Sequence, residues 1–90
     1  MGIYLELEYF KFKNDAIVFV GGEKLKRNSV AKITKHYDKF VEFTVNGNDE
    51  KYLQPNIFFT AVFKNISENQ YYKILKRRAM WLRKKFLKNR

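Results

Sequence analysis

Cysteine is absent from this 90-residue sequence, and histidine and proline occur once each. Without cysteine the chain forms no disulfide, no thiolate metal site and no thiol nucleophile. The single histidine, His36, has Lys35 and Tyr37 as its sequence neighbours. It therefore lacks the partners that an acid–base pair or a metal site requires. We predict an exposed histidine at a strand end, no catalytic residue, no metal, no cofactor and no enzymatic activity.

Long hydrophobic runs are also missing. The longest, from Ile57 to Phe63, is far shorter than the roughly 20 residues that span a bilayer. The start of the chain leads into an alternating strand pattern that contains acids, which is unlike a signal peptide. We therefore expect a soluble, cytoplasmic protein. Frequent Lys, Asn, Phe and Tyr, which have AT-rich codons, suggest a low-GC bacterium or one of its phages or plasmids.

Acidic residues are missing from the last quarter of the chain. Residues 69–90 contain nine Lys or Arg and no Asp or Glu, which gives a net charge of +9. Residues 1–68 contain ten Lys or Arg and all nine Asp or Glu, so they carry only +1 of the total +10. Like charges four positions apart on a helix cost about 0.2–0.5 kcal/mol per pair. A chain that keeps this uncompensated charge is expected to use it on an anionic partner.

Residues 67–90 are predicted to form one long amphipathic helix. Ser67 and Gln70 have the spacing of a capping box, and Ile66 and Tyr71 that of a hydrophobic staple. No Gly or Pro interrupts the run. One arc of the helix is apolar and is expected to pack on the rest of the protein. Its members are Tyr71, Tyr72, Leu75, Ala79, Leu82 and Phe86.

Four other apolar residues of this helix lie off the arc. Ile74 and Trp81, one heptad apart, lie beside it among cations, and Met80 and Leu87 point nearly opposite. Trp81 is either a core anchor or an exposed aromatic in a basic field. The second arrangement suits base stacking or a membrane interface. The sequence leaves both interpretations open.

The preceding residues read as five or six short antiparallel strands. Tight hairpins are expected at Gly21-Gly22 and at Asn46-Gly47, because these residues accept positive φ. A change of phase at Tyr9-Phe10 predicts a bulge or bend, and Ala31, Ile33 and Tyr37 are expected to share one strand face. The alternation places strands at residues 3–13, 16–20, 23–27, 30–37, 40–45 and 50–54.

Residues 56–65 fit a buried strand and a short helix about equally, and their aromatic and β-branched content favours the strand. The predicted fold class is α+β: a small antiparallel sheet or partly open barrel, followed by one long C-terminal amphipathic helix. We expect residues 1–90 to be a single domain, with a β-rich body at 1–65 and a basic helix at 67–90. Pleckstrin-homology-like and SH3-like barrels share this order, a likeness of architecture that does not assign a function.

Two groups of residues are candidates for binding an anionic partner. The predicted nucleic-acid-binding group is the outer surface of the helix, namely Lys73, Lys76, Arg77, Arg78, Trp81, Arg83, Lys84, Lys85 and Lys88. A secondary basic patch comprises Lys24, Lys26, Arg27, Lys32 and Lys35, and it would extend the first surface if it lies beside the helix.

These groups favour a small non-enzymatic nucleic-acid-binding protein with an accessory or regulatory role. The sequence does not distinguish DNA from RNA, and no base-reading motif is visible. One alternative is an interaction module in which the helix binds an acidic protein or a second copy of the chain, with Ile74, Met80, Trp81 and Leu87 as anchors. A second alternative is peripheral binding to anionic membrane lipid, which is disfavoured if the apolar arc is used in the core.

Overall fold

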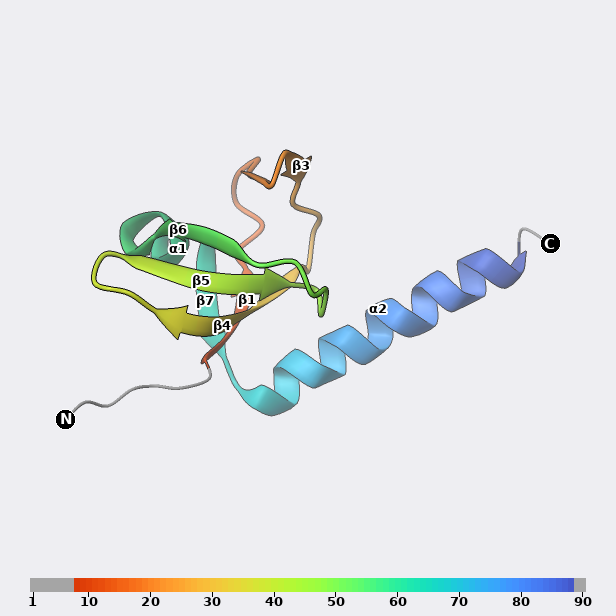
Figure 1. Cartoon of the computed structure of the whole chain (residues 1–90). Coiled ribbons are helices and arrows are strands. Elements are labelled where there is room, and N and C mark those ends of the chain that lie inside the picture. Colours follow the sequence, from red (N-terminus) through yellow and green to blue (C-terminus); the bar gives the residue numbers. More distant parts are fainter. Residues whose placement is uncertain (1–7, 89–90) are drawn as a thin grey trace.

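The computed structural model describes residues 8–88, with side chains from Tyr9 to Arg83. It confirms the α+β fold: a five-stranded antiparallel sheet of order β6-β5-β4-β1-β7, a separate two-stranded sheet β2-β3, and a C-terminal helix (Figure 1). The elements are β1 (Glu8–Phe12), β2 (Phe19–Val20), β3 (Glu23–Lys24), β4 (Val30–His36), β5 (Phe40–Val45), β6 (Tyr52–Pro55), α1 (Asn56–Val62), β7 (Phe63–Ile66) and α2 (Glu68–Lys88).

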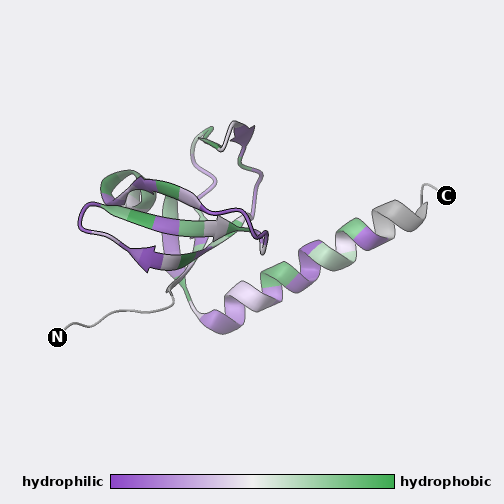
Figure 2. Cartoon of the chain, viewed as in Figure 1, coloured by the Kyte–Doolittle hydropathy of each residue, from purple (hydrophilic) through white to green (hydrophobic). Residues whose placement is uncertain are grey.

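The main core lies on one face of the five-stranded sheet. Apolar residues alternate with polar ones along β5, as Figure 2 shows, so every second side chain of that strand turns inward. Phe43 is fully buried at the centre, with its ring 4.9 Å from that of Phe59 and 6.0 Å from that of Phe63. The hairpin β2-β3 adds Val20 and Leu25 to the same cluster.

Strand β1 is buried on both faces. Phe10 and Phe12 belong to the main core, whereas Tyr9 points to the opposite face and packs under α2. The pairing of β1 with β4 and β7 runs without a register shift, so the bulge predicted at Tyr9-Phe10 is not found among the described residues. The alternation changes at Tyr9-Phe10 because apolar residues are buried on both faces of this strand. The part of the predicted first strand at residues 3–7 lies outside the described residues.

Both predicted tight hairpins are confirmed. Gly21 and Gly22 have φ of 61° and 84°, and Asn46 and Gly47 have φ of 53° and 77°, the signs that a type I′ turn requires. The register slips instead between Ile33 and Lys35 of β4. Because one extra residue moves the following side chains to the other face, the exposed Tyr37 does not share the face of the buried Ala31 and Ile33, contrary to the prediction from the alternation.

The strand favoured for residues 56–65 is wrong for its first part and right for its last. Asn56–Val62 form the short helix α1, which leads directly into strand β7. Pro55 precedes the helix with an extended backbone, which suits a residue that cannot donate from its nitrogen. The helix turns Phe59 and Val62 into the core and connects the two edge strands of the sheet, β6 and β7. Tertiary burial overrides the strand propensity of these residues.

The predicted capping box starts α2. The backbone N–H of Gln70 donates to the Ser67 Oγ at 3.1 Å, and the N–H of Ser67 donates to the Gln70 Oε1 at 3.1 Å. Glu68 lies in the first turn, where a negative charge suits the helix dipole. The helix contains 21 residues and is therefore about 30 Å long.

Candidate functional site

Among the described side chains, the buried contacts that attach helix α2 to the body lie in its first two turns. Tyr71 is 2% exposed and its ring centroid lies 4.8 Å from that of Tyr9. These two residues and Val30 form a second buried cluster, against which Ile66, Ile74 and Leu75 pack. We call these six residues the helix-docking cluster. Beyond it the helix extends away from the sheet (Figure 1).

The predicted packing arc of α2 is therefore wrong beyond Leu75. Leu82 is 55% exposed, and Tyr72 and Ala79 are exposed as well, whereas Ile74 takes part in docking. The residues that pack, Tyr71, Ile74 and Leu75, reach along the helix as far as the β5–β6 turn. A methyl group placed on Gly47 in that turn would lie 3.5 Å from the Leu75 Cδ atoms. Phe86 and Leu87 lie outside the residues whose side chains are described.

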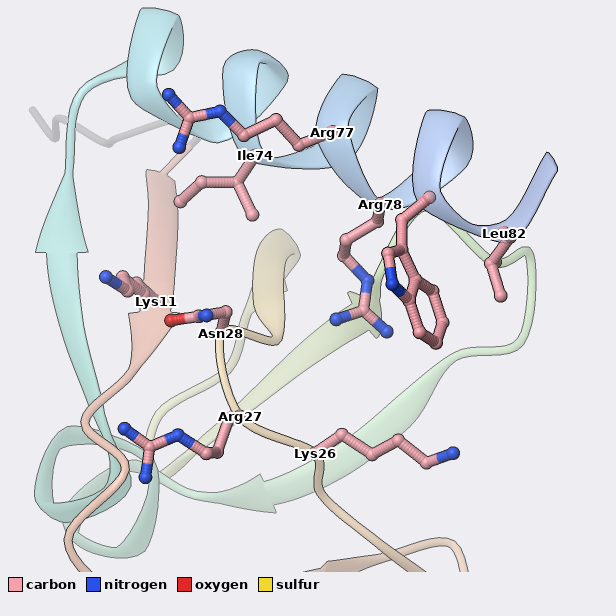
Figure 3. A pocket seen from close by; sticks show the side chains of 9 residues that line it. Lys11, Lys26, Arg27, Asn28, Ile74, Arg77, Arg78 and Leu82 are labelled. Atoms are coloured by element: carbon pink, nitrogen blue, oxygen red, sulfur yellow. The ribbon is translucent and has the colours of Figure 1, made fainter. Parts of the chain in front are cut away.

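A cleft of about 680 Å³ opens where α2 leaves the body. One wall is the helix, and the other consists of strand β1 and the turn that follows β3 (Figure 3). We call this hollow the basic cleft, because cations line both walls and no acidic residue is among its lining residues within the described chain. Its lining residues are Lys11, Lys26, Arg27, Asn28, Ile74, Arg77, Arg78, Trp81 and Leu82.

The turn that presents Lys26, Arg27 and Asn28 is held in a fixed conformation. Asn28 has a positive φ of 62°, and its N–H donates to the Asn14 Oδ1 at 3.1 Å. The buried Ser29 donates from its Oγ to the Lys26 carbonyl oxygen at 2.7 Å. The Ser29 carbonyl oxygen accepts from the Phe12 N–H at 2.8 Å. This wall of the cleft is therefore largely preorganised, so binding need not order its backbone.

Electrostatics in the basic cleft are dominated by its five cationic side chains, Lys11, Lys26, Arg27, Arg77 and Arg78. Burial lowers the pKa of the half-buried Arg78 guanidinium from its ordinary value. Arginine nevertheless stays charged at neutral pH. A charge that is partly removed from water is more strongly stabilised by an anion than a fully solvated one, because the surrounding dielectric is lower. Arg78 is thus placed to gain from an anionic ligand.

The structure divides the predicted helix group into three parts. Arg77, Arg78 and Trp81 line the basic cleft. Trp81 is 59% exposed, so the core interpretation of this residue is wrong. Lys73, Lys76 and Arg83 are exposed on α2 but are not among the lining residues. Lys84, Lys85 and Lys88 belong to α2 by their backbone, and their side chains lie outside the described part.

The secondary basic patch is divided as well. Lys26 and Arg27 line the basic cleft, and Lys24 borders a neighbouring hollow of about 270 Å³ that also reaches Arg78 and Leu82. Lys32 lies over the Tyr9 ring at 5.9 Å, on the docking face of the sheet. Lys35 lies over the Tyr37 ring at 5.1 Å, at the end of β4, and lines no described hollow. The helix surface and the patch therefore meet through the Lys24–Arg27 segment.

Four lining residues were in neither predicted group: Lys11, Asn28, Ile74 and Leu82. A signal for Lys11 existed, because it alternates with Phe10 and Phe12 and so shares the face of Tyr9. Leu82 was assigned to the packing arc. Only the folded structure shows that the helix extends beyond the sheet before it reaches this residue (Figure 1). For Asn28 no sequence signal pointed to the cleft.

His36 is exposed at the end of β4, as predicted. Within residues 8–88 no three His, Cys, Asp or Glu residues gather as a metal site would require. No helix in the described part is long and apolar enough to cross a membrane. Comparisons with protein-family models, curated proteins and solved structures find no match for the chain.

Proposed function

We propose that this chain is a small non-enzymatic nucleic-acid-binding protein of accessory or regulatory role, and that the basic cleft is its binding site. The observation that carries the proposal is the meeting of cations from two separate parts of the chain around one hollow. Lys26 and Arg27 line one wall, and Arg77 and Arg78 line the other together with the exposed Trp81. A cytoplasmic location is part of the same proposal.

Phosphate groups would offset the repulsion among the cations of the cleft. The five cations that line the cleft repel one another, and a polyanion bound there attracts all of them. Each neutralised phosphate also releases condensed counterions. With about four to six phosphate contacts, the logarithm of the binding constant falls against the logarithm of salt concentration with a slope of about −4 to −5.

The cleft also weighs against membrane lipid. The sequence disfavoured lipid binding because the apolar arc of the helix was expected to be used in the core. Leu82 of that arc is exposed, so this objection no longer holds. A bilayer surface, however, touches convex parts of a protein, whereas Lys11, Lys26 and Arg77 line a hollow. A second copy of the chain would bring its own basic helix and repel this one. An acidic protein partner is the second candidate, favoured by the exposed Met80 and Leu82 among cations.

The test is salt-dependent binding of labelled duplex DNA, single-stranded DNA and RNA, followed by anisotropy. The cleft variant carries Lys26→Gln and Arg77→Gln, one exposed cation from each wall. The matched control carries Lys39→Gln and Lys51→Gln, two exposed lysines that do not line the cleft and that remove the same charge. We expect the cleft variant to bind at least tenfold more weakly than the control and with a slope smaller by about 2.

Two results would contradict the proposal. Absence of binding to all three ligands at low salt removes it. Equal weakening in both variants means that net charge, and not the basic cleft, carries the binding. In either case light scattering tests self-association and a pulldown with acidic proteins tests the second candidate. A blue shift of the fluorescence of Trp81 with acidic vesicles alone would assign the helix to lipid.

A further inference from the structure

The two walls of the basic cleft differ in chemistry. All three apolar lining residues, Ile74, Trp81 and Leu82, come from α2. The opposite wall contributes only Lys11, Lys26, Arg27 and Asn28, which are cationic or polar. The α2 wall also carries Arg77 and Arg78, so a ligand that fits both walls offers a flat apolar face to Trp81 and anionic groups to the cations around it.

Single-stranded nucleic acid has this character, and a duplex does not. A single strand exposes the faces of its bases on one side and its phosphates on the other. A duplex hides its base faces in the stack and presents phosphates to every approaching surface. A tryptophan in a cleft lined by cations can therefore stack on bases only when those bases are free, as they are in a single strand.

The size of the cleft leads to the same conclusion. A volume of about 680 Å³ lies within the range of about 300–1,000 Å³ that accommodates one small molecule. That space suits one or two nucleotides.

We infer that the basic cleft binds single-stranded nucleic acid, with a base stacked on the indole of Trp81 and the phosphates held by Lys11, Lys26 and Arg27. This inference rests on the proposed nucleic-acid binding and narrows its ligand to single strands. The planar guanidinium of Arg78, which lies in the same wall, offers a second stacking surface for the base (Figure 3).

The chain supplies its own reporter, because Trp81 is its only tryptophan. The probes are a single-stranded DNA 12-mer, an RNA 12-mer, a hairpin duplex with the same number of phosphates, and an abasic 12-mer with identical charge and no bases. Anisotropy gives the affinities, and quenching of tryptophan fluorescence reports stacking. Charge alone favours the duplex, whose phosphates are more densely spaced. Tighter binding of the single strand therefore requires the bases.

We expect the single strands to bind at least tenfold more tightly than the duplex and the abasic strand, with quenching by the single strands only. Trp81→Ala should weaken single-strand binding roughly tenfold or more and leave duplex binding within about twofold. Trp81→Phe should restore most of the loss, because a ring remains. The matched control is Met80→Ala, which removes an exposed apolar side chain of α2 that does not line the cleft and should change neither affinity.

The outcomes separate the inference from the proposal on which it rests. If the duplex or the abasic strand binds as tightly as the single strand, or if Trp81→Ala has no effect, single-strand recognition is refuted while nucleic-acid binding stands. If none of the probes binds at low salt, both are refuted. Thermal unfolding of each variant shows that a lost affinity does not arise from a lost fold.

Discussion

At the scale of single residues, the tyrosine cluster under α2 determines how the helix is held. Burial raises the pKa of Tyr9 to about 12, and the neighbouring Tyr72 contributes to the rise. Burial likewise raises the pKa of Tyr71 above its ordinary value. Both hydroxyl groups are therefore kept neutral by the environment that the helix creates. The attachment of α2 is thus linked to pH in the alkaline range.

The first prediction concerns Tyr9 and alkaline pH. An unfolded tyrosine ionises at a pKa of about 10, whereas Tyr9 in the folded protein stays neutral until about 12. Below pH 10 the residue is neutral in both states and its contribution is complete. As the pH rises from 10 towards 12 only the unfolded state gains by ionising, so stability falls. The urea midpoint should drop between pH 10 and 12, and less steeply in Tyr9→Phe, which keeps the ring and loses the hydroxyl.

Comparison with the Phe variant is the control, because lysines titrate in the same range and affect both proteins equally. An equally steep drop in the two proteins would show that Tyr9 does not carry the effect.

At the scale of elements, sequence patterns located the strands well and misjudged what each helix does. Alternation and turn chemistry identified β5 with its observed bounds and both tight hairpins. For the residues of helix α1 a strand was favoured over the alternative helix, because their aromatic and β-branched side chains are typical of strands. Only the folded sheet shows that a helix buries them. The packing arc of α2 was misplaced, since helical periodicity gives the apolar face but not the length of the surface that it meets. The length of that surface depends on the tertiary structure.

The second prediction tests α1 as the element that completes the core. Phe59 is 1% exposed and contacts the rings of Phe10, Phe43 and Phe63, whereas its neighbour Phe58 is 37% exposed. Both substitutions to alanine change helix propensity in the same way, so their difference isolates packing. Phe59→Ala should lower the free energy of unfolding by about 3–5 kcal/mol.

Phe58→Ala should cost much less, because its ring is already partly in water. Urea denaturation of the two variants beside the unmodified chain measures both values. Similar losses would mean that α1 is held by its exposed face as much as by its buried one, contrary to the structure.

At the scale of the whole molecule, fold and binding surface occupy different parts of one chain. Every residue of the two buried clusters and of the apolar side chains packed on them lies at or before Leu75. The charge lies mostly after that point. The sequence therefore predicted that the helix is the basic element, but it did not predict which of its residues share a cleft with Lys11 and Lys26. That pairing depends on the crossing of α2 over β1, which no local pattern encodes.

The third prediction follows from this separation. Deleting residues 79–90 removes five of the Lys and Arg residues and the apolar positions Trp81, Leu82 and Phe86, but no member of either buried cluster. The shortened chain should unfold cooperatively with a free energy within about 1 kcal/mol of the full chain, because the apolar area buried by the body is retained. Its binding to nucleic acid should weaken by well over tenfold, since the basic cleft loses Trp81 and Leu82 from its lining and the helix loses five cations. Urea denaturation and anisotropy on the same preparation measure the two effects.

A shortened chain that fails to fold would show that the distal half of α2 packs on the body through its apolar arc, and the basic cleft would then not be open in solution.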